Sequence, residues 1–236
     1  MKSARFSFDD KLKPLLSHSQ RCGDFEYLFN GPQSIKHLIE SLSIPHTELG
    51  RLFANNRSIG IDYLVCDGDQ IMVQGTAEEM EAGEEPHFVI DGHLGRLASR
   101  LRMLGLDCYY QNDFEDMELV RVSVNEHRTL LTRDRRLLMH KAIQQGCLIR
   151  SLETGQQLQE VYRRYGLKRW VKPFHRCLRC NHTLEAVPKM DVLPLLEPLT
   201  AKFYDEFHIC PACKQIYWKG SHYDKMQKLI SVLDDD

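Results

Sequence analysis

The sequence predicts a mixed α/β protein with three parts: a small β-rich domain, a central parallel sheet covered by helices, and a cysteine-rich module at the C-terminal end. Three observations predict it. A strand, strand, helix, strand pattern opens the chain, apolar runs alternate with amphipathic helical patterns through its middle, and two C-x-x-C pairs follow. With 236 residues, 42% of them hydrophobic, the chain is long enough for about two or three small cores.

Composition and charge exclude some classes of protein. No stretch approaches the about 18 consecutive apolar residues of a membrane span, and the start MKSARFSFDDKLK lacks the apolar segment of a secretory signal. We therefore expect a cytoplasmic protein without membrane association. The net charge of -2 conceals a gradient, since residues 1–86 hold 8 Lys and Arg against 14 Asp and Glu, whereas residues 87–172 hold 15 against 10. A basic middle segment suits a polyanionic partner, although a solvated charged surface explains it equally well.

Residues 1–76 are predicted to form a β-grasp domain. Its elements are strands at 4–8 and 25–29, a helix at 34–42, and a strand pair at 63–75 around an Asp-Gly-Asp turn. The helix and the turn resemble those of ubiquitin-like domains related to small sulfur-carrier proteins. Those carriers depend on a free C-terminal Gly-Gly, whereas the last strand here continues into an acidic linker at residues 77–86. We therefore expect recognition of an unidentified protein, regulation or a structural role, and no sulfur transfer.

Residues 87–172 repeat one pattern four times, a strand followed by a helix. Predicted strands cover 87–91, 107–111, 129–132 and 147–152, and predicted helices cover 92–105, 116–127, 135–142 and 155–167. Strands that alternate with helices in this way indicate βαβ units. The segment is therefore expected to form a parallel sheet covered by helices.

Three of these strands end in acidic residues: Asp91, Asp113 and Asp134, with Glu115 and Asp116 close behind Asp113. Because the functional crevice of an open α/β sheet lies at the carboxyl ends of its strands, these side chains can meet although they are about 20 residues apart. A cluster of carboxylates repels itself unless a cation compensates, which suits Mg²⁺ or Mn²⁺. Asp is also a favoured N-cap residue, so each acid alone is equally well explained as a helix cap.

The two C-x-x-C pairs lie in residues 173–236. Their thiols belong to Cys177, Cys180, Cys210 and Cys213. Two such turns supply the four sulfur ligands of a closed tetrahedral Zn²⁺ site, which would hold this small module together. Disulfides would suit a secreted protein, and a redox motif would normally occur once, so zinc fits best. The other four cysteines are isolated in mostly apolar surroundings and are expected to be small core residues.

Several stretches together resemble one known family. They are VIDGHLGRLASRLRMLGLDCYYQND, LLTRDRRLL, FHRCLRCNHTLE and CPACKQIYWKGSH. They resemble the Mut-seven C-terminal RNase family, a branch of the PIN-like nucleases that carries a zinc ribbon and that, in some relatives, follows a ubiquitin-like domain. The resemblance covers nearly the whole chain. It implies a PIN-like three-layer α/β/α core and a metal-dependent ribonuclease activity.

The resemblance also implies roles for individual residues. Asp91 matches the first acid of the family, and Asp134 matches the acid of its T-x-D motif. The second acid corresponds to either Asp113 or Asp116. Glu153 stands where PIN nucleases often have a fourth acid, or it only opens the following helix. The number of catalytic metals therefore stays open.

The implied reaction is hydrolysis of RNA phosphodiester bonds with Mg²⁺ or Mn²⁺ held by these acids. Arginines near the strand ends could hold flanking phosphates, because guanidinium groups match phosphate geometry. The candidates are Arg96, Arg133, Arg135 and Arg136, each of which also suits a solvated surface. In the ribbon, Tyr217 and Trp218 could stack on unpaired bases or pack against the nuclease domain.

Two other functions fit part of the pattern. A non-catalytic RNA-binding or adaptor protein could keep a PIN-like fold and a zinc ribbon. A phosphatase with a strand-end Asp nucleophile would need a second Asp two positions after Asp91, where this sequence has His93. The ribonuclease interpretation is therefore favoured, with the adaptor as its alternative.

Overall fold

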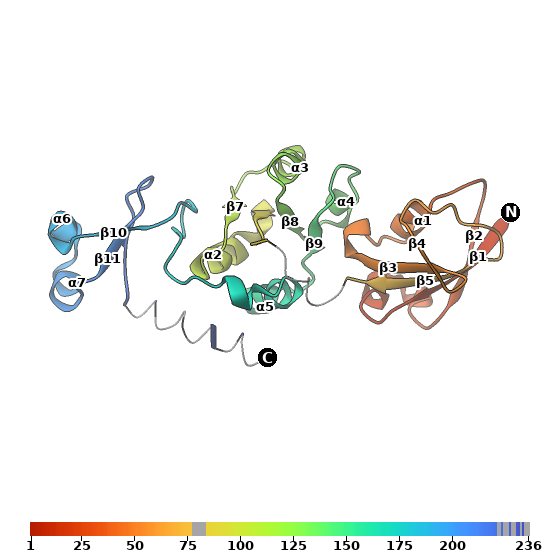
Figure 1. Cartoon of the computed structure of the whole chain (residues 1–236), viewed down its shortest axis with the longest axis horizontal. Helices are drawn as coiled ribbons and strands as arrows, with labels where there is room; N and C mark the ends of the chain where they lie inside the picture. The colour runs from red at the N-terminus through yellow and green to blue at the C-terminus, as the bar shows by residue number, and fades with distance from the viewer. Residues whose placement is uncertain (77–83, 221–222, 224–226, 228–229, 232, 234–236) are drawn as a thin grey trace. The chain divides into compact units, whose positions relative to one another are not determined.

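The computed structural model describes residues 1–76, 84–220, 223, 227, 230, 231 and 233 (Figure 1). The chain divides into two compact units, one made of Met1–Glu78 and Glu115–Ile149, the other of Glu79–Phe114 and Arg150–Asp236. Each unit thus combines segments that are distant in the sequence. Most of the predicted acidic linker, residues 77–83, lies outside the described residues.

The first unit opens with a five-stranded sheet in the order β2-β1-β5-β3-β4. Its strands are β1 (Lys2–Phe8), β2 (Phe25–Phe29), β3 (Leu49–Ala54), β4 (Arg57–Ile59) and β5 (Gln70–Gly75). Only the β1 and β5 pair is parallel. The helix α1 (Ile35–Ser41) begins where predicted, because the Ser34 hydroxyl accepts a hydrogen bond from the His37 N–H and so caps its first turn. A β-rich N-terminal domain is confirmed.

One prediction in this domain is wrong. The expected strand pair at 63–75 is a single strand, β5, preceded by a turn that Asp69 organises. The Asp69 side chain is buried and accepts hydrogen bonds from Tyr63 Oη at 2.9 Å, Cys66 N at 2.8 Å and Asn55 Nδ2 at 2.8 Å. The hairpin is instead β3 and β4, joined by Asn55 and Asn56 with φ of 52° and 63°. Asn-Asn is a recognisable signal for such a two-residue turn.

The rest of the first unit contains two parallel strands, β8 (Thr129–Thr132) and β9 (Gly146–Leu148). Every residue of both strands is buried, as expected for continuous apolar runs in a parallel sheet. The helices are α3 (Asp116–Asn125) and α4 (Arg135–Leu138). Helix α4 is shorter than the predicted 135–142, since Met139 is already its C-cap residue.

The N-terminal domain and β9 share a buried contact within this unit. Glu48 is 1% exposed, and its Oε1 accepts a hydrogen bond from the Leu148 N–H at 2.9 Å. Gly146 is required nearby, since a Cβ there would lie 2.5 Å from Leu138 Cδ2 and 3.3 Å from Thr47 Cγ2. The sequence did not indicate this contact between a carboxylate of the N-terminal domain and the backbone of β9.

The second unit contains the parallel pair β6 (Phe88–Ile90) and β7 (Cys108–Tyr110). The connecting helix α2 (Gly95–Met103) follows a short turn, η4 (Gly92–Leu94), and buries Leu97, Ala98 and Leu101. Helix α5 (Thr154–Arg164) continues into η5 (Leu167–Trp170). The Tyr165 ring packs edge-on against Phe88 of β6, with centroids 5.4 Å apart. Each unit thus contains a pair of short parallel strands with helices between them, and the predicted mixed α/β fold is confirmed.

The C-terminal module contains a three-stranded antiparallel sheet in the order β10-β11-β12. Its elements are β10 (Glu185–Val187), α6 (Lys189–Val192), η6 (Leu193–Leu195), α7 (Pro198–Phe203), β11 (Phe207–Ile209) and β12 (Ile216–Trp218). Among the described residues, no helix has both the length and the apolar character needed to span a bilayer.

Cysteines outside the C-x-x-C pairs divide into two groups. Cys108 and Cys147 are buried in β7 and β9, as expected for small core residues. Cys22 and Cys66 are exposed, so that expectation is wrong for them. Both lie in irregular segments between strands, where side chains are more often exposed.

Candidate functional site

Asp91 directly follows β6 and caps the turn η4. Its Oδ1 accepts a hydrogen bond from the His93 N–H at 3.1 Å, and the side chain is half-buried. Two glycines fix this turn against the end of β7. A Cβ on Gly92 would lie 2.8 Å from the carbonyl oxygen of Asn112, and one on Gly95 would collide with the Tyr110 hydroxyl. The D-G-x-x-G pattern therefore holds the Asp91 carboxylate in one place.

The candidates for a second acid differ in their surroundings. Asp113 is exposed in the loop after β7. Asp116 is exposed in the first turn of α3, where a negative charge interacts favourably with the helix dipole. Glu115 is the N-cap of α3, and Glu153 is the N-cap of α5, but neither side chain makes a capping hydrogen bond.

Asp134 follows β8 and caps α4. Its Oδ1 accepts hydrogen bonds from the N–H groups of Arg136 at 2.7 Å and Leu137 at 3.4 Å. Its own N–H donates to the hydroxyl of Thr132, which is fully buried. The T-x-D sequence thus builds a fixed strand-to-helix turn that leaves the carboxylate exposed.

The four Asp residues are divided equally between the two units. Asp91 and Asp113 lie in the second unit, and Asp116 and Asp134 lie in the first. The structure therefore gives the local surroundings of each acid, and their convergence on one cation stays a prediction.

The four predicted phosphate-binding arginines fall into two groups. Arg96, Arg133 and Arg136 are exposed. Arg135 is half-buried, and its Nη1 donates hydrogen bonds to the carbonyl oxygens of Leu15 at 2.8 Å and Ser43 at 3.2 Å. Arg135 therefore ties α4 to the N-terminal domain, a role that the sequence did not indicate.

The four cysteines of the C-x-x-C pairs come together. Their sulfur atoms all lie within 4.8 Å of one another, with Cys177 Sγ 3.5 Å from Cys213 Sγ and Cys180 Sγ 3.3 Å from Cys210 Sγ. A tetrahedral zinc site with bonds of about 2.3 Å has sulfur-to-sulfur edges of about 3.8 Å. The four thiols therefore fit one Zn²⁺. Among the described residues, this is the group of possible metal ligands whose atoms all lie within 4.8 Å of one another.

Both pairs use the same turn. The N–H of Asn181 donates to the Cys177 carbonyl at 2.9 Å, and the N–H of Lys214 donates to the Cys210 carbonyl at 3.0 Å. Asn181 and Lys214 both have positive φ, 69° and 59°. This left-handed residue after each pair directs the two sulfur atoms of that pair to the same side.

The pKa values of the cysteines in this cluster shift in opposite directions. Burial raises the pKa of Cys177, but hydrogen bonds from Tyr217 and from backbone N–H groups outweigh it and lower that pKa to about 6. Burial raises the pKa of Cys180 to about 12 and also raises that of Cys213. These shifts favour a thiolate at Cys177 and thiols at Cys180 and Cys213, whereas a divalent cation would stabilise several thiolates at once.

Arg102 connects this cluster to the parallel pair β6 and β7, and sequence reasoning missed it. It is 4% exposed, although a charged residue of an amphipathic helix ordinarily faces solvent. Its Nη1 donates to the carbonyls of Leu178 and Arg179, and its Nε and Nη2 donate to the carbonyl of Cys108. The bonds to the carbonyls of the two residues between Cys177 and Cys180 anchor this first C-x-x-C turn to α2 and β7.

Comparison with known proteins identifies two families along the chain. The family described as Mut7-C RNAse domain matches residues 86–230, and the family described as Mut7-C ubiquitin matches residues 1–81. Neither a curated protein nor a solved structure gives a match. The resemblance drawn from the sequence motifs is confirmed.

Proposed function

Because the chain belongs to the Mut7-C RNAse domain family and carries that family's ubiquitin-like domain, we propose that it is a metal-dependent ribonuclease. Asp91, Asp134 and either Asp113 or Asp116 would supply the oxygen ligands for Mg²⁺ or Mn²⁺. When bound, the cation supplies Lewis acidity for hydrolysis of the phosphodiester bond. The expected cytoplasmic location belongs to the same proposal.

The surroundings of Asp134 carry this proposal. Its Oδ1 is used as the helix cap, while its Oδ2 accepts no hydrogen bond from the described part of the chain. One carboxylate can therefore cap α4 and still offer an oxygen to a cation. The fixed turn would also hold that oxygen in place, as catalytic carboxylates require.

Exposed arginines support RNA as the substrate. Arg133 and Arg136 flank Asp134, and Arg96 lies in the first turn of α2, after Asp91. Each could contact a phosphate through two parallel hydrogen bonds. Arg135 is left out of this proposed set, because its Nη1 already binds carbonyl oxygens of the N-terminal domain.

A cleavage assay with cap-preserving variants tests the proposal. Asn caps a helix as well as Asp does but is a poor ligand for Mg²⁺, so Asp91→Asn and Asp134→Asn remove the metal site while keeping the turns. Zinc-loaded protein is incubated with structured and unstructured RNAs, with Mn²⁺, Mg²⁺ or no added metal. Parallel Asp113→Asn and Asp116→Asn variants identify the second acid.

We expect cleavage by wild type with Mn²⁺ or Mg²⁺, and a loss of at least about 100-fold in each variant at an essential acid. Activity without added metal, or activity kept in both Asp91→Asn and Asp134→Asn, contradicts the proposal.

A non-catalytic RNA-binding protein is the second candidate. The observation in its favour is that Asp91 and Asp134 both act as helix caps, which explains their presence without catalysis. It predicts that wild type binds RNA and cleaves none of the panel. It also predicts that Asp134→Asn leaves RNA affinity unchanged.

A further inference from the structure

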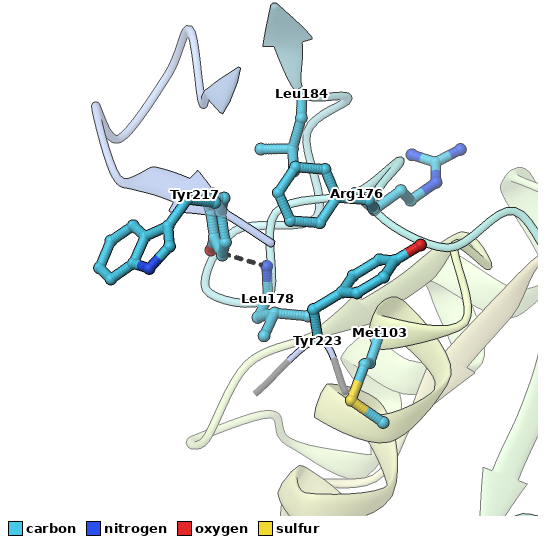
Figure 2. A pocket seen from close by; sticks show the side chains of 8 residues that line it. Met103, Arg176, Leu178, Leu184, Tyr217 and Tyr223 are labelled. Atoms are coloured by element: carbon cyan, nitrogen blue, oxygen red, sulfur yellow. Dashed lines mark hydrogen bonds between the residues drawn. The ribbon is translucent and has the colours of Figure 1, made fainter. Parts of the chain in front are cut away.

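An aromatic pocket lies in the second unit (Figure 2), and one of its lining residues, Tyr217, packs against the cysteine cluster. Its volume is about 90 Å³, and eight side chains line it. Four of the eight are aromatic: Phe174, Tyr217, Trp218 and Tyr223. Three segments build it. Besides the segment that carries Tyr217, these are the end of α2, with Met103, and the segment around the first C-x-x-C turn, with Arg176 and Leu178.

Local structure holds the rings of this pocket in place. The Tyr217 hydroxyl accepts a hydrogen bond from the Leu178 N–H at 3.0 Å, drawn as a dashed line in Figure 2. Phe174 packs edge-on against Tyr223 at 5.9 Å and against Tyr217 at 6.4 Å. Phe174 also has a φ of 67°, a costly backbone conformation for a bulky residue. Such strain tends to occur where a side chain must be held in one position for a function.

Part of the pocket lining comes from a basic segment of the chain. Residues 168–182 contain five Lys and Arg and no Asp or Glu. Arg176 lines the pocket and is fixed by Asp107, with Nη2 3.2 Å from Oδ2, and by the carbonyl of Asn181, which accepts from Nη1 at 3.0 Å. Its Nε is buried and has no hydrogen-bond partner among the described residues. A basic segment thus accompanies the rings.

We propose that this pocket binds one unpaired base of an RNA strand whose phosphates follow residues 168–182. Aromatic rings stack on the faces of bases regardless of sequence, and the basic segment neutralises the backbone. An apolar peptide side chain would not use the charge of this segment. The inference rests on the proposed function only for its choice of RNA.

Fluorescence can test this without cleavage. The chain has two tryptophans, so Trp170→Phe leaves Trp218 as its reporter in the pocket. Zinc-loaded full-length protein, without Mg²⁺ or Mn²⁺, is titrated with an unstructured RNA oligonucleotide and with an abasic oligonucleotide of the same length. We expect the RNA to quench Trp218, and the abasic strand to bind at least about tenfold more weakly without quenching it.

Variants in the pocket locate the base. Phe174→Ala and Tyr223→Ala are each expected to weaken RNA binding about tenfold, which corresponds to about 1.4 kcal/mol, and to leave abasic-strand binding unchanged. Phe203→Ala is the matched control, because Phe203 is an aromatic residue of the same module that is 66% exposed and lies outside the pocket. One bound zinc per chain confirms that each variant is folded.

The outcomes separate this inference from the proposed function. Equal affinity for RNA and abasic strands, or unchanged RNA affinity in Phe174→Ala and Tyr223→Ala, overturns the base pocket even if the protein cleaves RNA. Quenching that depends on the pocket supports it even if the protein cleaves none.

Discussion

Arg102 Nη1 donates a hydrogen bond to the carbonyl oxygen of Leu178 at 3.1 Å, and this bond joins α2 to the turn between Cys177 and Cys180. The guanidinium is buried, and burial disfavours its charge and lowers its pKa. The carbonyl oxygens that accept its hydrogen bonds offset part of this cost. Arg102→Lys keeps the charge but loses the fork of donors, which makes it a non-conservative change at this position.

Arg102→Ala is expected to destabilise the protein by about 3 kcal/mol, because it removes the donors to the buried Cys108 carbonyl and to the carbonyls of Leu178 and Arg179. Urea unfolding measures the loss, and Arg102→Lys should fall between Arg102→Ala and wild type. Arg100→Ala is the control on an exposed position of the same helix, where the expected change is under about 0.5 kcal/mol. Equal stability of the Arg102→Ala and Arg100→Ala variants would show that the anchor has no energetic weight.

Acid should release zinc from the cysteine cluster. The pKa values of Cys180 and Cys213 are raised, so zinc binding must displace at least these two protons near neutral pH. Proton competition grows as pH falls, and zinc affinity should decrease about 100-fold per pH unit between pH 8 and 7. A chromophoric chelator reports the affinity at each pH. An affinity that does not change over this range would argue against a four-thiolate site.

The contact of Glu48 with the Leu148 N–H should contribute to the stability of the first unit. Glu48→Ala removes the acceptor and leaves a buried N–H unsatisfied, with an expected cost of about 1–3 kcal/mol. Glu26→Ala changes an exposed carboxylate of the same domain and should have little effect. Chemical denaturation compares the two variants. A Glu48→Ala protein as stable as the Glu26→Ala protein would mean that water replaces the carboxylate.

The two roles of Asp134 can be separated by stability measurements. Asp134→Asn should leave the free energy of unfolding nearly unchanged, since Asn accepts the same hydrogen bonds from the N–H groups of Arg136 and Leu137. Asp134→Ala should cost about 1 kcal/mol, because α4 loses its cap. Thermal unfolding distinguishes these outcomes. A large loss in Asp134→Asn would show that the charge, and not the cap, supports the fold.

Features set by local sequence could be predicted. The zinc cluster follows from the spacing of four cysteines, and the strands β6 to β9 follow from apolar runs that tolerate burial on both faces. The capping roles of Asp91 and Asp134 also follow from the sequence, because strand-to-helix turns favour Asp.

Features set by tertiary contacts could not be predicted. Arg102 is charged and stands at an outer position of a helical pattern, so only the carbonyls that converge on it explain its burial. The same holds for Glu48 and Arg135, whose partners lie about 100 residues away in the chain.

Binding of Mn²⁺ to zinc-loaded protein tests the central claim most directly. Calorimetric titration of wild type should show binding of Mn²⁺, and Asp91→Asn and Asp134→Asn should each weaken that binding at least about 100-fold while the zinc content stays constant. Equal Mn²⁺ affinity in wild type and both variants would contradict a cation site built from the acids at the strand ends.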